Sequence, residues 1–121
     1  MDEKTFQQRT KKLGLDVIKL VEILPKANTA DVIGRQLLRS ATSVGANYRA
    51  ACRAKSPADM INKFKIVEEE TDETLYWLEM LEESGIVQKS QVQNLLKEAN
   101  EILAMIVSSL KTLRSRNLSR S

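Results

Sequence analysis

Four arginines on one expected helix are the residues whose type and spacing could do chemistry. They are Arg35, Arg39, Arg49 and Arg53. At 100° per residue these four positions fall within about 80° of one another on a helical wheel. A guanidinium group binds phosphate or carboxylate oxygens through two parallel hydrogen bonds. The stripe therefore predicts contact with nucleic acid or with an acidic partner, and a solvated surface without a ligand is the alternative.

The composition excludes most catalytic and metal chemistry. The chain has no histidine and a single cysteine, Cys52. Zinc sites made of Cys and His, histidine-based triads and carboxylate-histidine di-iron sites therefore cannot be built. We expect Cys52 to be a small buried hydrophobe and the acidic run 69–73 to be a solvated face. The sequence predicts a protein that is not an enzyme and that has no metal and no cofactor.

The elements that carry these residues are predicted to be four helices. Glycine and proline together make only 6 of 121 residues, too few for the turns of an all-β fold. Apolar residues recur every three or four positions, and we expect helix boundaries at Pro25, Thr29, Ser56 to Pro57, Gly85 and Ser90. The prediction is an all-α fold, an antiparallel up-and-down four-helix bundle in one domain over residues 1–113. We expect residues 114–121 to be a basic, disordered tail.

Each expected helix has one apolar stripe that should face the core. The first stripe is Phe6, Leu13, Val17, Leu20 and Leu24. The second is Ile33, Leu37, Ala41, Val44, Tyr48 and Ala51. The third is Met60, Phe64, Val67, Thr71, Leu75, Leu78 and Leu81, and the fourth is Leu96, Ala99, Leu103, Ile106, Leu110 and Leu113. The longest apolar run spans only residues 102–107, and no secretion signal opens the chain, so we expect a cytoplasmic protein that does not cross a membrane.

Two further lines of residues flank the core stripe of the second expected helix. A line of small residues contains Gly34, Ala41, Gly45 and Cys52, which predicts that another helix approaches closely there. A line of polar residues contains Gln36, Ser40, Ser43 and Asn47. We interpret this polar stripe as hydrogen bonds that fix the register of the bundle, and a ligand site is the alternative.

The third expected helix carries a second line of side chains outside its core stripe. Its members are Ile66, Glu70, Glu73, Trp77 and Met80. Tryptophan and methionine are enriched where subunits meet, so this line predicts an oligomer interface. The alternative is that Trp77 lies over a neighbouring helix of the same bundle.

Charge is distributed unevenly along the chain, although the formal net charge is only +3. Residues 29–55 contain five basic and one acidic residue, whereas residues 56–88 contain two basic and nine acidic residues. The positive and negative helices can pair within one bundle or between copies of the chain. The second route predicts a head-to-tail homo-oligomer that closes into a ring.

Several segments resemble one bacterial family. They are the run from Gln36 to Tyr48, then Ser56 and Asp59, and the run from Glu69 to Glu79. The chain resembles the four-helix-bundle proteins encoded in intervening sequences of 23S ribosomal RNA genes, also called S23-like ribosomal proteins. It is similar more distantly to the accessory variability proteins of diversity-generating retroelements. The resemblance implies a cytosolic, ring-like homopentamer, without known enzymatic activity, and for the distant relatives association with nucleic acid.

Two functional hypotheses follow from the sequence. In the first, a homo-oligomeric accessory protein, pentameric by the resemblance, binds RNA or DNA weakly through basic surfaces. The residues assigned to this role are Arg35, Arg39, Arg49, Arg53, Lys111, Arg114, Arg116 and Arg120. In the second, the chain is a protein-interaction scaffold whose arginines bind the acidic helix of a neighbouring subunit, without a nucleic-acid role.

Overall fold

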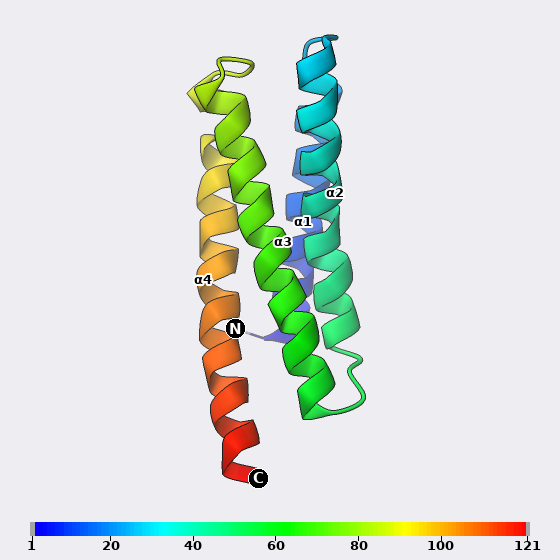
Figure 1. Cartoon of the computed structure of the whole chain (residues 1–121), viewed down its shortest axis with the longest axis vertical. Coiled ribbons are helices and arrows are strands. Elements are labelled where there is room, and N and C mark those ends of the chain that lie inside the picture. Colours follow the sequence, from blue (N-terminus) through cyan, green and yellow to red (C-terminus); the bar gives the residue numbers. More distant parts are fainter. Residues whose placement is uncertain (1, 121) are drawn as a thin grey trace.

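The computed structural model describes residues 2–120, and the side chains of residues 2–117. Its four helices are α1 (Glu3–Glu22), α2 (Asn28–Ala51), α3 (Pro57–Glu83) and α4 (Lys89–Arg120), with no strand among the described residues. Figure 1 shows them standing side by side, each antiparallel to the one before it. The all-α class is therefore confirmed, and the up-and-down arrangement agrees with it.

Local signals place most helix ends. The Ser56 side chain accepts a hydrogen bond from the backbone N–H of Asp59 at 3.1 Å, and Pro57 follows in the first turn, as expected. Gly85 adopts a φ of 81° just after α3, a conformation that favours glycine. The second helix begins at Asn28, and its N-cap is Ala27 rather than the expected Thr29; Ala27 supplies no side-chain hydrogen bond.

The core fills the space among the four helices in two clusters. At one end Phe6 and Phe64 contact the ring of Tyr48, with ring centroids 4.5 and 5.7 Å apart. At the other end Leu37 packs with residues of α1, α3 and α4. All six expected core positions of α2 are buried. Burial of the Tyr48 side chain raises the pKa of its phenol far above the ordinary value.

The last helix differs from the expectation in two ways. Its buried residues are Val92, Ala99, Ile102, Ile106 and Leu110, while the expected Leu96, Leu103 and Leu113 are only half-buried. Apolar residues occupy more than one face of α4, and the predicted stripe is therefore displaced toward one side of the face that is actually buried. The helix also continues through Arg120 rather than ending in a disordered tail after residue 113. Residues 114–120 contain neither glycine nor proline, so nothing in their sequence stops the helix. Ser121 lies outside the described residues.

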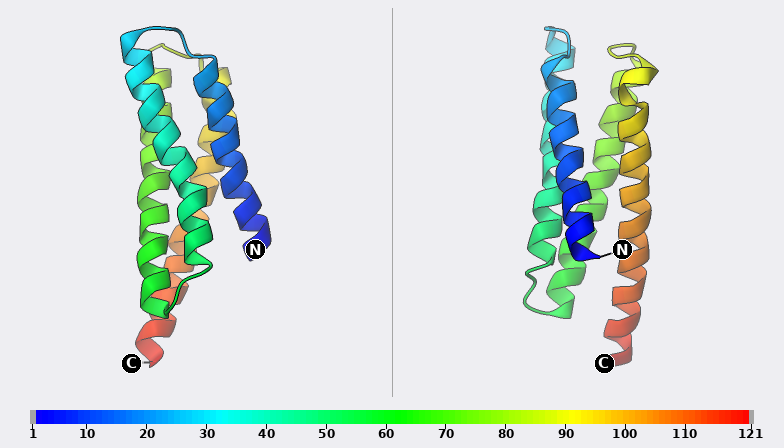
Figure 2. Two further views of the ribbon diagram at one scale, coloured as in Figure 1. Left: turned by 90° about the vertical axis from the view of Figure 1, so that its right-hand side faces the viewer. Right: turned by 180° about the vertical axis from the view of Figure 1, so that it is seen from behind.

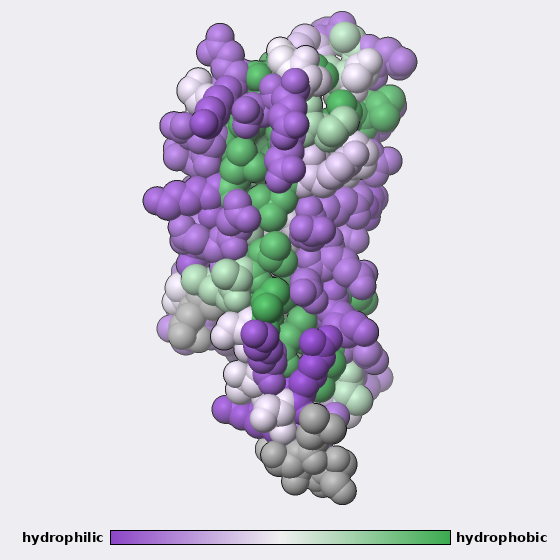
Figure 3. Space-filling view, turned by 60° about the vertical axis from the view of Figure 1, so that its left-hand side comes forward, coloured by the Kyte–Doolittle hydropathy of each residue, from purple (hydrophilic) through white to green (hydrophobic). Residues whose placement is uncertain are grey.

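The first and last helices are the least tightly joined neighbours. Both views of Figure 2 show α1 packed along α2, and only a thin contact connects α1 with α4. Arg9 of α1 bridges this seam, because its guanidinium donates hydrogen bonds to Glu98 at 2.5 and 3.0 Å and to Glu101 at 3.0 Å. These carboxylates raise the pKa of Arg9. Figure 3 shows a strip of hydrophobic surface running between polar ridges on the face of the molecule where α4 comes forward.

Helices α1 and α2 approach each other closely at a glycine. A Cβ atom added to Gly45 would lie 3.3 Å from the carbonyl carbon and oxygen of Thr10. At Gly14, across the same contact, an added Cβ would meet the α2 backbone at an ordinary 3.6 Å. The close approach expected from the small-residue line of α2 is therefore present, and α1 is the helix that approaches.

No helix in the described part of the chain combines the length and the apolar character needed to cross a bilayer.

We predict that the two helical glycines of α2 respond oppositely to substitution. Gly34→Ala places its methyl group 3.0 Å from the movable end of Leu24, and alanine favours the helix by up to about 1 kcal/mol, so its free energy of unfolding should be unchanged or higher. Gly45→Val presses on the backbone of α1 and should lower the free energy of unfolding by roughly 2 kcal/mol. Urea unfolding followed by circular dichroism measures both. Equal stability of wild type and Gly45→Val would contradict the close approach.

Candidate nucleic-acid interface

An open groove of about 570 Å³ runs between α1 and α2. Gly14 and Gly45 line it, so backbone forms part of its wall. Lys4 and Lys11 of α1 line the same groove as Arg49 and Arg53, which belong to the end of α2 and the turn after it. No acidic residue and no aromatic residue is among the residues that line it. The groove therefore gathers four positive charges from two helices.

These four cations differ from others that the chain neutralises internally. Ion pairs within the described residues involve Arg9, Lys12, Arg39 and Lys63. Among those residues, Lys4, Lys11, Arg49 and Arg53 form none. Like charges that line one concave surface reinforce each other's field and attract anions. The groove is thus a positive surface whose charges have no partner in the described part of the chain.

A second basic surface lies at the same end of the bundle. Figure 1 shows the last turns of α4 extending beyond the loop that joins α2 to α3. Residues 105–120 contain four basic residues and no acidic one, and Lys111, Arg114 and Arg116 are exposed. The side chain of Arg120, also assigned to this role, lies outside the described side chains. Residues 70–83 of α3, by contrast, contain six acidic residues and no basic one.

The arginine stripe predicted on α2 divides in the structure. Arg49 and Arg53 reach the groove, whereas Arg35 is exposed near the other end of α2 and is not among the groove residues. Arg39 turns toward α3, where its guanidinium lies 3.3 Å from a carboxylate oxygen of Glu70 and also pairs with Glu73. These carboxylates raise the pKa of Arg39. The four arginines therefore do not act as one surface.

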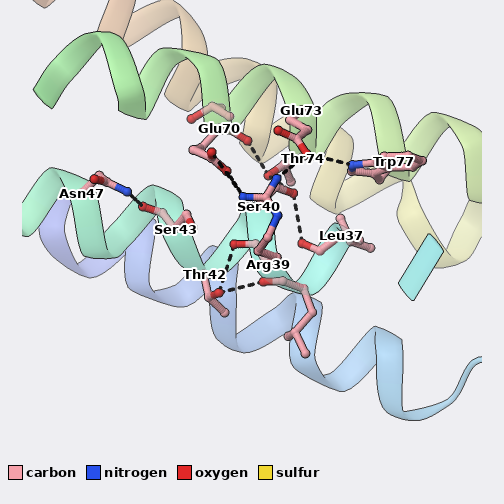
Figure 4. Close-up of polar contacts among 12 residues, drawn as sticks. Leu37, Arg39, Ser40, Thr42, Ser43, Asn47, Glu70, Glu73, Thr74 and Trp77 are labelled. Carbon is pink, nitrogen blue, oxygen red and sulfur yellow. Dashed lines mark hydrogen bonds and ion pairs between the residues drawn. The ribbon is translucent and has the colours of Figure 1, made fainter. Parts of the chain in front are cut away.

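Figure 4 shows that Arg39 belongs to a polar network between α2 and α3. The hydroxyl of Thr74 lies 3.1 Å from that of buried Ser40 and 2.8 Å from the Glu70 carbonyl oxygen. Ser40 also donates to the Leu37 carbonyl at 3.1 Å. No described buried side-chain nitrogen or oxygen lacks a hydrogen-bond partner. The contact of Ser40 with Thr74 supports a register role for this part of the polar stripe.

The rest of the polar stripe does not enter this network. Asn47 donates to the Ser43 carbonyl within α2 at 2.9 Å, and Gln36 is exposed. Asn47 therefore bonds within its own helix and Gln36 faces solvent, and neither forms a hydrogen bond between the helices.

The residues assigned to an oligomer interface have mixed surroundings. Glu70 and Glu73 pair with Arg39 of the same chain, and Trp77 is half-buried against the core while its indole N–H donates to Glu73 at 3.3 Å. Ile66 and Met80 remain exposed. Tyr76, which is not part of the predicted interface line, is exposed beside Trp77 with ring centroids 5.0 Å apart. A helical wheel places Tyr76 and Met80 on the outward face of α3, and this position could have identified Tyr76.

Cys52 and the acidic side chains are the other groups whose surroundings bear on chemistry. Cys52 is half-buried, and burial raises the pKa of its thiol, which lowers its thiolate content. No group of three or more potential metal ligands occurs among the described residues.

The fold and its charged groove define a small helical bundle protein with a basic groove. The chain belongs to the family of 23S rRNA-intervening sequence proteins, whose family model matches residues 3–108. It is also similar to a solved protein of unknown function from the S23 ribosomal protein family of Bacteroides thetaiotaomicron. The two share 32% sequence identity with a TM-score of 0.85, over 92% of this chain and 99% of the other. A comparison with curated protein sequences gives no match. The resemblance to the 23S rRNA intervening-sequence proteins seen in the sequence is therefore confirmed.

We predict that the buried hydroxyl of Thr74 stabilises the contact between α2 and α3. Thr74→Val removes the hydrogen bond to Ser40 and should lower the free energy of unfolding by about 1 kcal/mol. Thr71→Val is the matched control, because the equally buried Thr71 hydroxyl bonds only to the Val67 carbonyl of its own helix. Urea unfolding compares the variants. An equal loss in both would assign the effect to the valine side chain rather than to the interhelical bond.

A second prediction concerns acid stability. The Arg39 guanidinium, helped by the Trp77 indole, holds the pKa of Glu73 below its ordinary value near 4.5. A lowered folded-state pKa contributes stability above the unfolded-state value, and this stability is lost as the pH falls through the folded-state value. The urea midpoint of the wild type should therefore fall more steeply between about pH 5 and about pH 3 than that of Glu73→Gln.

The acid slope should be reduced in Glu73→Gln but not abolished. Asp2 and Asp59 also have lowered pKa values, through hydrogen bonds from Thr5 and Lys63 respectively, and both remain in the variant. Identical slopes in wild type and variant would show that the Arg39 pair contributes nothing to stability.

Proposed function

We propose that this protein is a non-enzymatic binding protein for nucleic acid, which it holds by the phosphate backbone at the basic end of the bundle. The observation that carries the proposal is the groove between α1 and α2, where Lys4, Lys11, Arg49 and Arg53 gather with no acidic residue in the groove lining and no ion pair among the described residues. A regularly spaced polyanion supplies the countercharge that the groove lacks.

The chemistry of the groove favours the backbone over the bases as the point of contact. Base recognition in single strands uses aromatic side chains on which bases stack, and none lines this groove. Phosphate contacts position a protein but carry no sequence information. Binding should therefore be weak, salt-dependent and without sequence preference. The exposed basic residues of the protruding α4 segment would extend the same positive surface.

The alternative function is a scaffold in which the basic residues of α2 bind α3 of a neighbouring subunit. One observation speaks against this scaffold, since Arg39 already binds Glu70 and Glu73 within its own chain. Another supports it, since Tyr76 and Met80 remain exposed on an acidic helix. Whether the groove is open to nucleic acid in solution decides between the two functions.

The test measures the salt dependence of binding to a labelled single-stranded RNA and to a DNA duplex by fluorescence anisotropy. Arg49→Ser combined with Arg53→Ser should weaken RNA binding by roughly tenfold. It should also flatten the slope of log K against log salt by about 1.4 for the single strand.

The matched control is Arg35→Ser, because Arg35 is an exposed arginine of the same helix that does not line the groove. This variant should retain affinity and slope. Wild-type protein that binds RNA and DNA no better than a neutral protein at low salt would exclude the proposed function. A change in affinity and slope in Arg35→Ser that is half as large as in the double variant would exclude the groove as the site, because each arginine would then count equally.

A further inference from the structure

The last turns of α4 project from the end of the bundle. This helix continues through Arg120, and both views of Figure 2 show its end passing beyond the loop that joins α2 to α3. On the inner side of the helix, Ile106 and Leu110 are buried in the core and hold this segment to the other helices. The outer side of the same turns is exposed to solvent. One face of α4 is therefore anchored while the opposite face can meet a ligand.

The outer side carries a line of hydroxyl groups. Ser108, Thr112 and Ser115 are all exposed, and they are spaced by four and three residues. At 100° per residue they fall within about 60° of one another, opposite Ile106 and Leu110. The Thr112 hydroxyl donates to the Ser108 carbonyl oxygen of its own helix at 3.3 Å, and its oxygen can still accept a hydrogen bond from another molecule. We call these three residues the hydroxyl line.

Cations border the hydroxyl line on both sides. On the helical wheel Lys111 and Arg114 lie on one side of it and Arg116 lies on the other. All three are exposed, and none of them forms an ion pair among the described residues. The sequence from residue 102 to residue 120 contains no acid, and the preceding Glu101 is already paired with Arg9 of α1. The end of α4 thus combines a neutral hydrogen-bonding face with positive charge along both edges.

The dimensions and chemistry of this face match the major groove of B-form DNA. An α-helix with its side chains is about 10–12 Å across, and the major groove is about 12 Å wide. Phosphates border the groove on both sides, and serine or threonine hydroxyls bond to the base edges inside it. The face from Ser108 to Asn117 is about 14 Å long, which corresponds to about four base pairs. The major groove of duplex RNA is too deep and narrow for side chains to read.

We propose that the last turns of α4 lie in the major groove of a B-form DNA duplex. The hydroxyl line faces the base edges, Lys111 and Arg114 contact phosphates of one strand, and Arg116 contacts phosphates of the other. This inference rests on the proposed function and deepens it, because it names the nucleic acid that the protein prefers. The groove between α1 and α2 binds the backbone of any nucleic acid, and the end of α4 selects duplex DNA.

The experiment compares a short DNA duplex with an RNA duplex of the same sequence by fluorescence anisotropy. The wild type should bind the DNA duplex roughly tenfold more tightly than the RNA duplex. Thr112→Trp places a bulky, uncharged ring on the hydroxyl line and prevents the helix from entering the major groove. This variant should lose the preference for DNA and keep the wild-type affinity for the RNA duplex.

A second variant tests the cations beside the hydroxyl line. Arg114→Ser combined with Arg116→Ser should weaken binding to the DNA duplex by roughly tenfold and flatten the slope of log K against log salt by about 1.8. Binding to the RNA duplex should stay close to that of the wild type. Arg49→Ser combined with Arg53→Ser removes the same charge from the groove between α1 and α2, and it should weaken binding to both duplexes alike.

Gln93→Trp is the matched control for the bulky substitution. Gln93 is an exposed residue of the same helix, about 29 Å from Thr112, so this variant should behave as the wild type. Circular dichroism checks that each variant keeps its helix content. If Thr112→Trp does not fold, Ser108→Trp blocks the same face one turn earlier and takes its place in the comparison.

Several outcomes overturn the assignment of α4 to the major groove. They are equal binding of the two duplexes by the wild type, tighter binding of the RNA duplex, and a DNA preference that survives in the folded tryptophan variant. An equal loss for both duplexes in the variant of Arg114 and Arg116 overturns it as well. Salt-dependent binding in any of these cases leaves the proposed function standing. A wild type that binds neither duplex and no single-stranded RNA excludes the proposed function together with the DNA preference.

Discussion

At Gly45 the backbone of α2 passes so close to Thr10 that an added Cβ would stand 3.3 Å from backbone atoms of α1. This contact fixes how α1 crosses α2, and the groove above it follows from that crossing. Because Gly14 and Gly45 add no side chains to the wall, the long side chains of Lys11 and Arg49 border an open surface rather than a filled contact. The same glycine therefore joins two helices and creates the space in which charges from both can meet a common ligand.

The arginines of α2 differ in whether they have acidic partners. About three turns before Arg49 on α2, Arg39 binds two carboxylates of α3, so this arginine contributes to the contact between the helices. At the groove the acids are missing, and the cations there have no countercharge among the described residues. The arginines of one helix thus have two different surroundings, since Arg39 is paired with acids of α3 whereas Arg49 lines a groove without acids. The small net charge of +3 does not reveal that paired and unpaired basic residues lie on different surfaces.

Much of the fold was predictable because its signals are local. Pro57 after a capping serine and Gly85 with its positive φ mark the ends of α3, and the core stripe of α2 follows a 3.6-residue period. The core edge of α4 was not predictable, because Leu96 and Ile102 are equally apolar and only the positions of α1 and α3 decide which is buried. The length of α4 was not predictable from apolar periodicity, because an exposed helix such as its last turns needs no apolar stripe.

The candidate site was predictable only in part, because it joins two helices. Arg49 and Arg53 stood out by their spacing on a single helix, but Lys4 and Lys11 belong to α1 and share no pattern with them in the sequence. The crossing at Gly45 brings the four together. The groove formed by the two crossing helices offers both a row of cations and an exposed apolar end. A ligand that contacts both parts would bind it more tightly than one that contacts only the cations. Phosphates satisfy only the first, so specificity for one nucleic acid would have to come from a surface other than this groove.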